Sequence, residues 1–140
     1  LVNSGRLSVA NPYPESPAVT AAGWSVQNVP ITLPGGARGS LVGLAKQVGT
    51  AFIGVLYRPT RGHELAEFAR IEATGLPFRF FVCGPGGIGD PEGKLAAALQ
   101  AEPDSFALIR PDLYLGALIR SATAAQAEAA LRKALCLAQV

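Results

Sequence analysis

The sequence contains few of the residue types that build catalytic or metal centres. Its 140 residues include one histidine, two cysteines, one tryptophan and no methionine. The histidine, His63, has Glu64 and Glu67 nearby, a group that falls short of the ligand set a metal ion needs. No arrangement of nucleophile, base and acid is evident along the chain. The cysteines, Cys83 and Cys136, lie far apart and form no disulfide framework, which predicts a protein of the reducing cytoplasm.

Charge is scarce as well. Lys and Arg total 12, Asp and Glu total 10, and charged residues make up 16% of the chain, against about a quarter in a typical domain. Neither sign is clustered, which argues against a nucleic acid or an anionic membrane as partner. Hydrophobic residues reach 49%, so we expect another protein surface to cover part of the domain. The alternative is an ordinary domain in which alanine inflates the hydrophobic count.

Long apolar runs and targeting signals are also missing. No stretch approaches the roughly 20 apolar residues that cross a bilayer, and no basic segment followed by an apolar one marks a signal peptide. The chain begins at Leu1 rather than at a methionine. We therefore expect further sequence ahead of Leu1, either a short processed leader or a large domain.

Proline and glycine punctuate residues 1–48. The segment 11–17 (NPYPESP) alone holds three prolines, which favour extended backbone and exclude helix. One short helix is predicted here, with Ser40 as its N-cap and Val48 near its end. We interpret residues 1–48 as an extended connector arm and residues 49–140 as one compact domain.

The compact part alternates between strand and helix signals. Apolar β-rich runs bounded by turn residues predict strands, and apolar residues at helical spacing behind a capping residue predict helices. The expected elements are a strand over 50–58, a helix over 61–74 capped by Thr60, a strand over 78–83, a helix to Gln100 with Asp90 as N-cap and Pro91 as its first residue, a hairpin over 105–119, and a helix from Ser121 or Thr123 to Ala138. Thr123 with Gln126 matches a capping box for the last helix.

The predicted order is therefore β-α-β-α-β-β-α. The first two strands are joined through a helix, so they should be parallel with a right-handed crossover. The last two are joined by a tight turn and should be antiparallel. The expected fold is an α/β fold with a mixed four-stranded sheet in the thioredoxin-like arrangement, preceded by the N-terminal arm.

Thiol chemistry is the first function that this order suggests. Redox thioredoxins place a Cys-x-x-Cys motif after the first strand of this unit, where a helix N-terminus lowers a thiol pKa. Here the corresponding segment 57–63 reads YRPTRGH and has no cysteine. This argues against a thiol–disulfide enzyme and against a peroxiredoxin-like enzyme. We expect Cys83 and Cys136 to be small buried hydrophobes.

A glycine-rich loop is the second candidate. Residues 84–89 (GPGGIG) match G-x-G-x-x-G between a strand and a helix, the pattern of a dinucleotide-binding loop. Three observations favour a loop fitted to the protein surface instead. The preceding strand is the second of the unit rather than the first. Asp90 would place a carboxylate beside any bound phosphate. A dinucleotide site also needs a next parallel strand that ends in an acidic residue, whereas a hairpin follows here.

Five residues are candidates for contact with a neighbouring domain. Arg110 and Asp112 flank a proline in the hairpin turn, where they would anchor a partner or, in the case of Asp112, cap the turn through its carboxylate. Trp24, Tyr13 and Tyr114 are the candidate contact aromatics. Trp24 lies in the arm, where it either pins the arm to the core or meets a partner.

Three parts of the chain, in order, carry a family resemblance. The first is the run 4–8 (SGRLS) with 13–17 (YPESP). The second is the helix–strand step 44–56 (LAKQVGTAFIGVL), and the third is the hairpin 108–118 (LIRPDLYLGAL), with the DPEG run at 90–93 ahead of it. Together they resemble the C-terminal region of flavoprotein aromatic hydroxylases of the phenol hydroxylase and 3-(3-hydroxyphenyl)propionate hydroxylase type, in which the first part is similar to a connector. The hairpin departs from the family at three positions.

Those departures are Leu113, where glycine is usual, and Ala117 and Leu118, where tryptophan and arginine are usual. The resemblance implies a thioredoxin-like tail domain without catalysis, which packs on the missing N-terminal catalytic domains of its own enzyme or on a second subunit. The parent enzyme would use FAD, NAD(P)H and O₂ to hydroxylate a phenolic ring. Its flavin-binding motifs lie outside this sequence, so no catalytic, cofactor-binding or metal residue is assigned here. The alternative is a free-standing, redox-inactive thioredoxin-like module that binds a protein partner.

Overall fold

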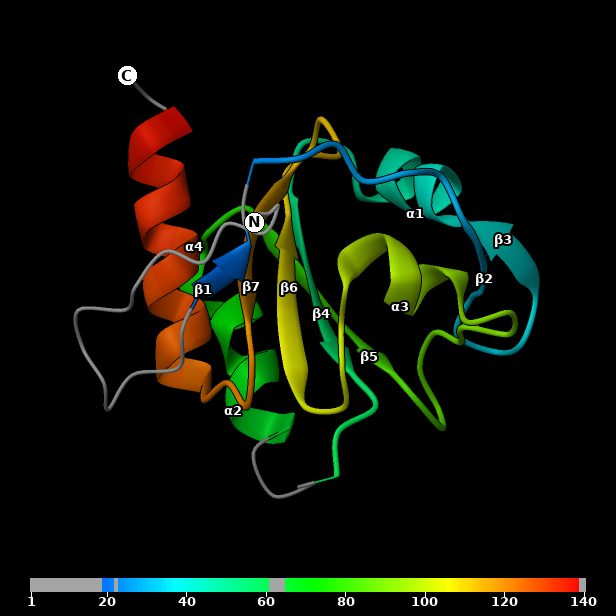
Figure 1. Ribbon diagram of the computed structural model, residues 1–140. Helices are drawn as coiled ribbons and strands as arrows, with labels where there is room; N and C mark the ends of the chain where they lie inside the picture. Colours follow the sequence, from blue (N-terminus) through cyan, green and yellow to red (C-terminus); the bar gives the residue numbers. More distant parts are fainter. Residues whose placement is uncertain (1–18, 22, 61–64, 139–140) are drawn as a thin grey trace.

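The computed structural model describes residues 19–21, 23–60 and 65–138. Their centre is a five-stranded sheet with the order β1-β7-β6-β4-β5 (Figure 1). The strands are β1 (Val19–Ala21), β4 (Phe52–Tyr57), β5 (Phe78–Cys83), β6 (Ser105–Ile109) and β7 (Leu115–Ile119). β4 pairs in parallel with β5 and antiparallel with β6, and β6 pairs antiparallel with β7. The predicted mixed four-stranded sheet is therefore confirmed.

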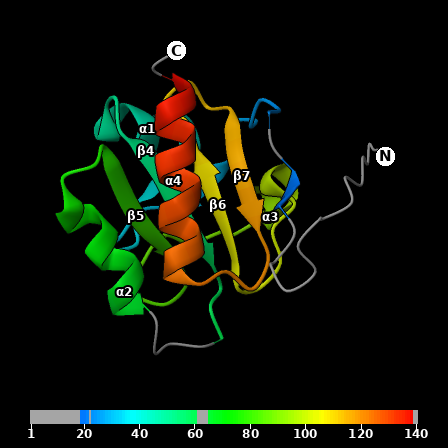
Figure 2. The same cartoon turned by 90° about the vertical axis from the view of Figure 1, so that its left-hand side faces the viewer.

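Helices cover both faces of this sheet (Figures 1 and 2). One face carries α2 (Leu65–Arg70), the 3-10 helix η2 (Ile71–Thr74) and α4 (Ala124–Ala138), and the other carries α1 (Leu41–Val48) and α3 (Lys94–Leu99). β4 lies inside the sheet, and all six of its residues are buried. Continuous burial of this kind explains why the strand reads as an unbroken apolar run.

The two faces have separate cores of different composition. On the α1–α3 face, Ile53 and Val55 of β4 pack among aliphatic residues that include Leu95. On the α2–α4 face, the rings of Phe68 and Phe106 stack with their centroids 5.7 Å apart. Alternate side chains of a strand point to opposite faces, so the single strand β4 contributes to both cores.

Part of the predicted arm completes the fold. β1 pairs antiparallel with β7 as a fifth strand of the sheet, and β2 (Pro30–Thr32) and β3 (Arg38–Ser40) form a separate two-stranded hairpin. Val26 and Ile31 are buried in the same core cluster as Ile53 of β4. Residues on both sides of position 48 therefore share one core.

The local helix signals were correct where a capping residue lies next to its helix. The Ser40 hydroxyl accepts the N–H of Gly43 at 3.0 Å, and α1 follows as predicted. At the start of α4, the N–H of Gln126 donates to the Thr123 hydroxyl at 3.2 Å, and the N–H of Thr123 donates to the Gln126 side chain at 2.9 Å. This reciprocal pair is the predicted capping box.

The helix predicted over 61–74 differs from the structure. Within the described residues it is divided into α2 and η2, and it ends at Gly75 with φ of 86°. Thr60 bonds the Asp104 carboxylate through its N–H at 2.8 Å and through its hydroxyl at 2.5 Å. The contact with Asp104 is a tertiary one, which no capping pattern reveals. His63 lies outside the described residues.

Helix α3 starts later than predicted. Asp90 and Pro91 lie in a turn ahead of it, and Gly93 has a φ of 71°. This left-handed backbone breaks the helical path between Pro91 and the helix. The Asp90 carboxylate still accepts the N–H groups of Leu95 and Ala96, at 2.9 and 3.0 Å. The N-cap position of α3 is Gly93, so Asp90 caps this helix from three residues further upstream.

Gly54 lies at the centre of β4, where two phenylalanine rings close over the strand. A Cβ at this position would lie 2.5 Å from Phe78 and 2.8 Å from Phe106, well inside the separation of non-bonded carbon atoms. The two rings themselves lie 6.4 Å apart between centroids. The missing side chain of Gly54 therefore makes room for the aromatic core on the α2–α4 face.

We predict that Gly54→Ala lowers the free energy of unfolding by about 2 kcal/mol, because the added methyl group forces the ring packing apart. Urea unfolding followed by circular dichroism measures the loss. The matched control is Gly116→Ala in β7, where a Cβ would meet its nearest atom, the Leu108 carbonyl oxygen, at 3.4 Å. Equal losses in the two variants would contradict this account of Gly54.

Candidate functional site

The carboxyl ends of β4 and β5 lie side by side, and Tyr57 pairs there with Cys83. Cys83 is 1% exposed. Burial, helped by the nearby Asp90 carboxylate, raises the pKa of its thiol to about 11. The thiolate is the reactive form of cysteine, so at neutral pH Cys83 is a protonated core residue, as predicted. Cys136 is exposed on α4, and the prediction of burial was wrong there because it falls outside the apolar stripe of that helix.

Asp90 is one of two buried polar residues in the described chain. Its carboxylate accepts the Tyr57 hydroxyl at 2.9 Å in addition to the two N–H groups of α3. These bonds join the end of β4 to the start of α3. A buried carboxylate with three donors is satisfied by the protein itself, so its role here is to position elements.

The glycine loop 84–89 is also satisfied internally. The N–H groups of Gly84, Gly87 and Ile88 donate to carbonyls within residues 82–88, and the N–H of Gly89 donates to the Thr32 carbonyl at 2.9 Å. Cβ atoms at 87 and 89 would collide with Val82 and Thr32 respectively. Close packing of the loop on β5 and β2 therefore explains these glycines, and these N–H groups are not free to hold a phosphate.

The hairpin turn between β6 and β7 is built by Asp112. The Asp112 carboxylate bonds the Arg110 guanidinium at 2.8 Å and accepts the N–H of Tyr114 at 3.3 Å. The Arg110 guanidinium also lies 5.7 Å from the centroid of the Tyr114 ring. Leu113 has a φ of 66°, so the backbone keeps the left-handed conformation that favours glycine. Asp112 thus has the predicted turn-capping role.

The candidate contact residues of the described chain lie on neighbouring segments. The N–H of Leu115 donates to the Trp24 carbonyl at 2.8 Å, and Ser25 forms a bridge with Tyr114. This pairing brings Trp24 beside the hairpin that carries Arg110 and Asp112. Tyr114 is 41% exposed and is the exposed large hydrophobic residue of the described part. Contact of these residues with another domain stays a prediction, and Tyr13 lies outside the described residues.

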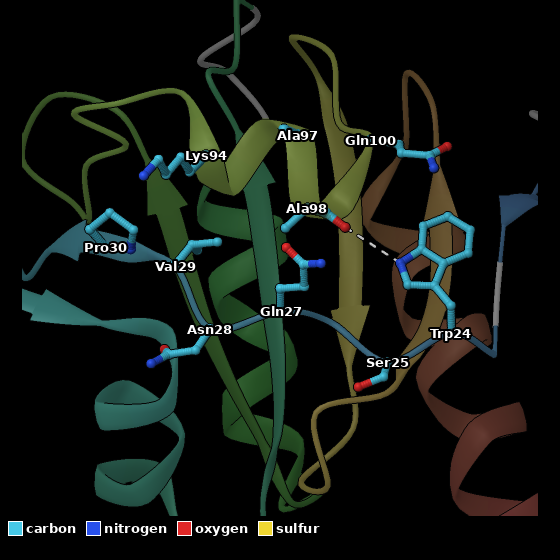
Figure 3. Close-up of a pocket in the computed structure, with 10 residues that line it drawn as sticks. All are labelled: Trp24, Ser25, Gln27, Asn28, Val29, Pro30, Lys94, Ala97, Ala98 and Gln100. Carbon is cyan, nitrogen blue, oxygen red and sulfur yellow. Dashed lines mark hydrogen bonds between the residues drawn. The ribbon is translucent and has the colours of Figure 1, made fainter.

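Trp24 also lines a groove that the sequence did not predict. The groove lies between the segment 24–30 and helix α3, and its volume is about 610 Å³ (Figure 3). The indole N–H of Trp24 points at the Ala98 carbonyl across a distance of 3.4 Å. Trp24 thus pins the arm against α3, which is one of its two predicted roles. No local pattern could reveal the groove, because its two walls are far apart in the sequence.

The described residues were also considered for a metal site and for a membrane-spanning helix. These residues contain no group of three or more His, Cys, Asp or Glu side chains that could hold a metal ion. Across the same part of the chain, no helix combines the length and apolar character needed to cross a membrane.

No family model and no curated protein matches the chain, whereas solved structures do. Plasmodium yoelii thioredoxin peroxidase I matches at a TM-score of 0.56 and 14% identity, over 85% of this chain and 91% of its own. The fold is thioredoxin-like. A thioredoxin domain of a thiol–disulfide oxidoreductase from Bacteroides vulgatus agrees, at a TM-score of 0.53 and 8% identity, over 81% of this chain and 96% of its own.

Two flavoproteins match the same thioredoxin-like chain. A ternary complex of aklavinone-11 hydroxylase with FAD and aklavinone matches at a TM-score of 0.64 and 25% identity, over 81% of this chain. The flavin-dependent monooxygenase PieE, in complex with FAD and substrate, matches at 0.55 and 23%, over 91% of this chain. The thioredoxin-like chain spans only 21% and 24% of the length of these two flavoproteins.

We predict that alkaline pH weakens the fold through Tyr57. Burial, followed by the hydrogen bond to Asp90, raises the pKa of Tyr57 to about 12. The unfolded chain releases this proton near its ordinary pKa of about 10, while the folded chain holds it until about 12. The stabilisation is therefore complete below pH 10 and is lost as the pH rises to 12.

Urea unfolding at a series of pH values from about 9 to 12 measures this slope. Tyr57→Phe should lower stability at neutral pH by about 1 kcal/mol through the lost hydrogen bond. It should also make stability fall less steeply above pH 10. Tyr114→Phe is the matched control, because the Tyr114 side chain is exposed. Parallel pH profiles for wild type and Tyr57→Phe would show that Tyr57 does not carry the effect.

Proposed function

We propose that this chain is a non-catalytic C-terminal domain of a flavin-dependent aromatic hydroxylase, and that it serves interdomain packing or dimerisation. The observation that carries the proposal is the likeness to aklavinone-11 hydroxylase, which covers 81% of this chain but 21% of that enzyme. PieE supports it with a similar share, 24% of its own length. The hairpin and connector segments that resemble aromatic hydroxylases give independent support from the sequence.

The residues at the sheet end also favour a domain without its own redox reaction. The segment 57–63 lacks cysteine, and the pKa of the buried Cys83 thiol is raised to about 11. We assign no FAD site to the described residues, because the N–H groups of Gly84, Gly87, Ile88 and Gly89 bond within the protein and the Asp90 carboxylate accepts three bonds from the protein itself. In the proposed enzyme, FAD and NAD(P)H would bind to other domains and supply the oxygenation chemistry there.

The surface around Tyr114 is the proposed packing surface. Tyr114 is 41% exposed, and Arg110 and Asp112 flank it in an ordered turn. Tyrosine and arginine contribute strongly to protein interfaces because they combine apolar area with directed polar groups. Their position on a rigid hairpin keeps the conformational cost of docking low.

A free-standing interaction module is the second candidate. Plasmodium yoelii thioredoxin peroxidase I matches over 91% of its own length, so a fold of this size also exists as a whole protein. Such a module would use the same surface for a separate protein partner. The two proposals differ in whether a catalytic flavoprotein is part of the same polypeptide.

We predict that the protein expressed from the complete reading frame is yellow and several times longer than this chain. The flavin spectrum and the mass are the two measurements. The 140-residue chain alone is the control; it should retain no flavin and oxidise no NADPH or NADH, because its loop and carboxylate are satisfied internally. A colourless full-length protein of about this chain's mass would refute the hydroxylase proposal and favour the free-standing module. Saturable flavin binding by the 140-residue chain would contradict its assigned role.

We predict that Tyr114→Glu in the complete protein loosens this domain from the rest. The charge would be forced into an apolar contact, so limited proteolysis should release the domain at least about tenfold faster than in wild type. Lys133→Glu on the exposed side of α4 is the matched control. In the 140-residue chain alone, Tyr114→Glu should change the free energy of unfolding by less than about 0.5 kcal/mol, as is usual for surface sites. Unchanged proteolysis would exclude Tyr114 from the packing surface.

A further inference from the structure

The groove beside Trp24 has the size and shape of a small binding site. Its volume of about 610 Å³ lies within the roughly 300–1,000 Å³ of known ligand sites. One wall is the extended segment 24–30, and the other is α3, where Ala97 and Ala98 leave room between the walls. Figure 3 shows the two walls facing each other with side chains between them.

The polar lining consists mainly of side-chain amides. Gln27, Asn28 and Gln100 line the groove and are exposed. The Gln27 amide points toward α3, whereas the Asn28 amide turns toward α1, where its oxygen accepts the N–H of Val42 at 3.0 Å. A side-chain amide both donates and accepts, so Gln27 can bond both an N–H and a C=O group of an extended peptide backbone.

The charge of the groove is positive at one end. Of the ten residues that line the groove, Lys94 is the one that carries a charge. Its ammonium group lies 3.2 Å from the Glu92 carboxylate, and the two side chains are 62% and 55% exposed. An ion pair this exposed is weak, so an incoming carboxylate can replace Glu92 as the partner of Lys94.

The opposite end of the groove is aromatic. Figure 3 shows Trp24 and Lys94 at the two ends of the lining, with the amide side chain of Gln27 between them. The Trp24 indole is partly buried and is held by its N–H bond to Ala98. A compact anion would meet only the lysine end. The lining therefore favours an elongated ligand with an apolar end and an acidic end.

We propose that this groove binds a short extended peptide segment, with an apolar side chain against Trp24 and an acidic side chain at Lys94. The middle of the peptide would bond the Gln27 amide. This inference uses the α3 face and does not rest on the proposed flavoprotein parent. It assigns a ligand to a surface separate from the Tyr114 turn.

Trp24 makes the test direct, because it is the single tryptophan of the chain. The probe is the blocked peptide acetyl-FGAEE-amide, titrated to about 1 mM against the 140-residue chain with excitation of tryptophan alone. The comparison peptide is acetyl-FGAKK-amide, which has the same length and apolar end but opposite charge. We expect saturable change of Trp24 fluorescence with the acidic peptide, at least about threefold weaker binding of the basic one, and weaker binding at higher salt.

Three variants then locate the site. Lys94→Gln should weaken the acidic peptide about threefold, and Glu92→Gln should tighten it by a similar factor because it frees the lysine. Ala97→Leu should abolish binding by filling the groove, while keeping a good helix former in α3. Lys133→Gln on α4 is the matched control and should bind as wild type does. Circular dichroism confirms that each variant is folded.

Several outcomes would overturn the proposal. These are no saturable change with either peptide, equal binding of the two peptides, or wild-type binding by Ala97→Leu. A further test adds free glutamate in place of the peptide. If free glutamate bound as tightly as the acidic peptide, Lys94 would be a simple anion site, and the peptide proposal would be overturned. The flavin content of the complete protein has no bearing on these results, so the two proposals fail or hold separately.

Discussion

The burial of β4 is the constraint on which the rest of the structure depends. A strand whose six residues are all buried needs hydrogen-bonding neighbours on both edges and packed layers on both faces. β5 and β6 supply the edges, and the helices on the two sides of the sheet supply the layers. Gly54 lets the aromatic core close over the strand, whereas Ile53 and Val55 face the aliphatic core. One strand therefore determines the three-layer arrangement.

At the end of β4, buried polar side chains join the strand to helix α3. Tyr57 finishes β4 and donates to Asp90, which also holds the first N–H groups of α3. All three bonds to the Asp90 carboxylate come from the protein itself, so the network ties the end of the strand to the start of the helix. The adjacent Cys83 is kept protonated by burial.

The two proposed interaction surfaces lie where the sheet edge meets the arm. The segment around Trp24 pairs with the start of β7, next to the turn that presents Tyr114. The same segment faces α3 across the groove that ends at Lys94. The low share of charged residues, 16%, is the sequence observation that led us to propose such surfaces. Two adjoining surfaces of different character, one aromatic and rigid, the other amide-lined, follow from a single extended segment.

The sequence by itself determined the features whose causes are local. The strand runs, the Ser40 and Thr123 caps and the missing cysteine motif could all be read because neighbouring residues produce them. Only the tertiary structure decided that Thr60 bonds Asp104, that Asp90 caps α3 from a distance, and that the arm and α3 enclose a groove. These contacts join residues that the chain brings together only after the sheet has formed, so their geometry depends on packing rather than on any short pattern.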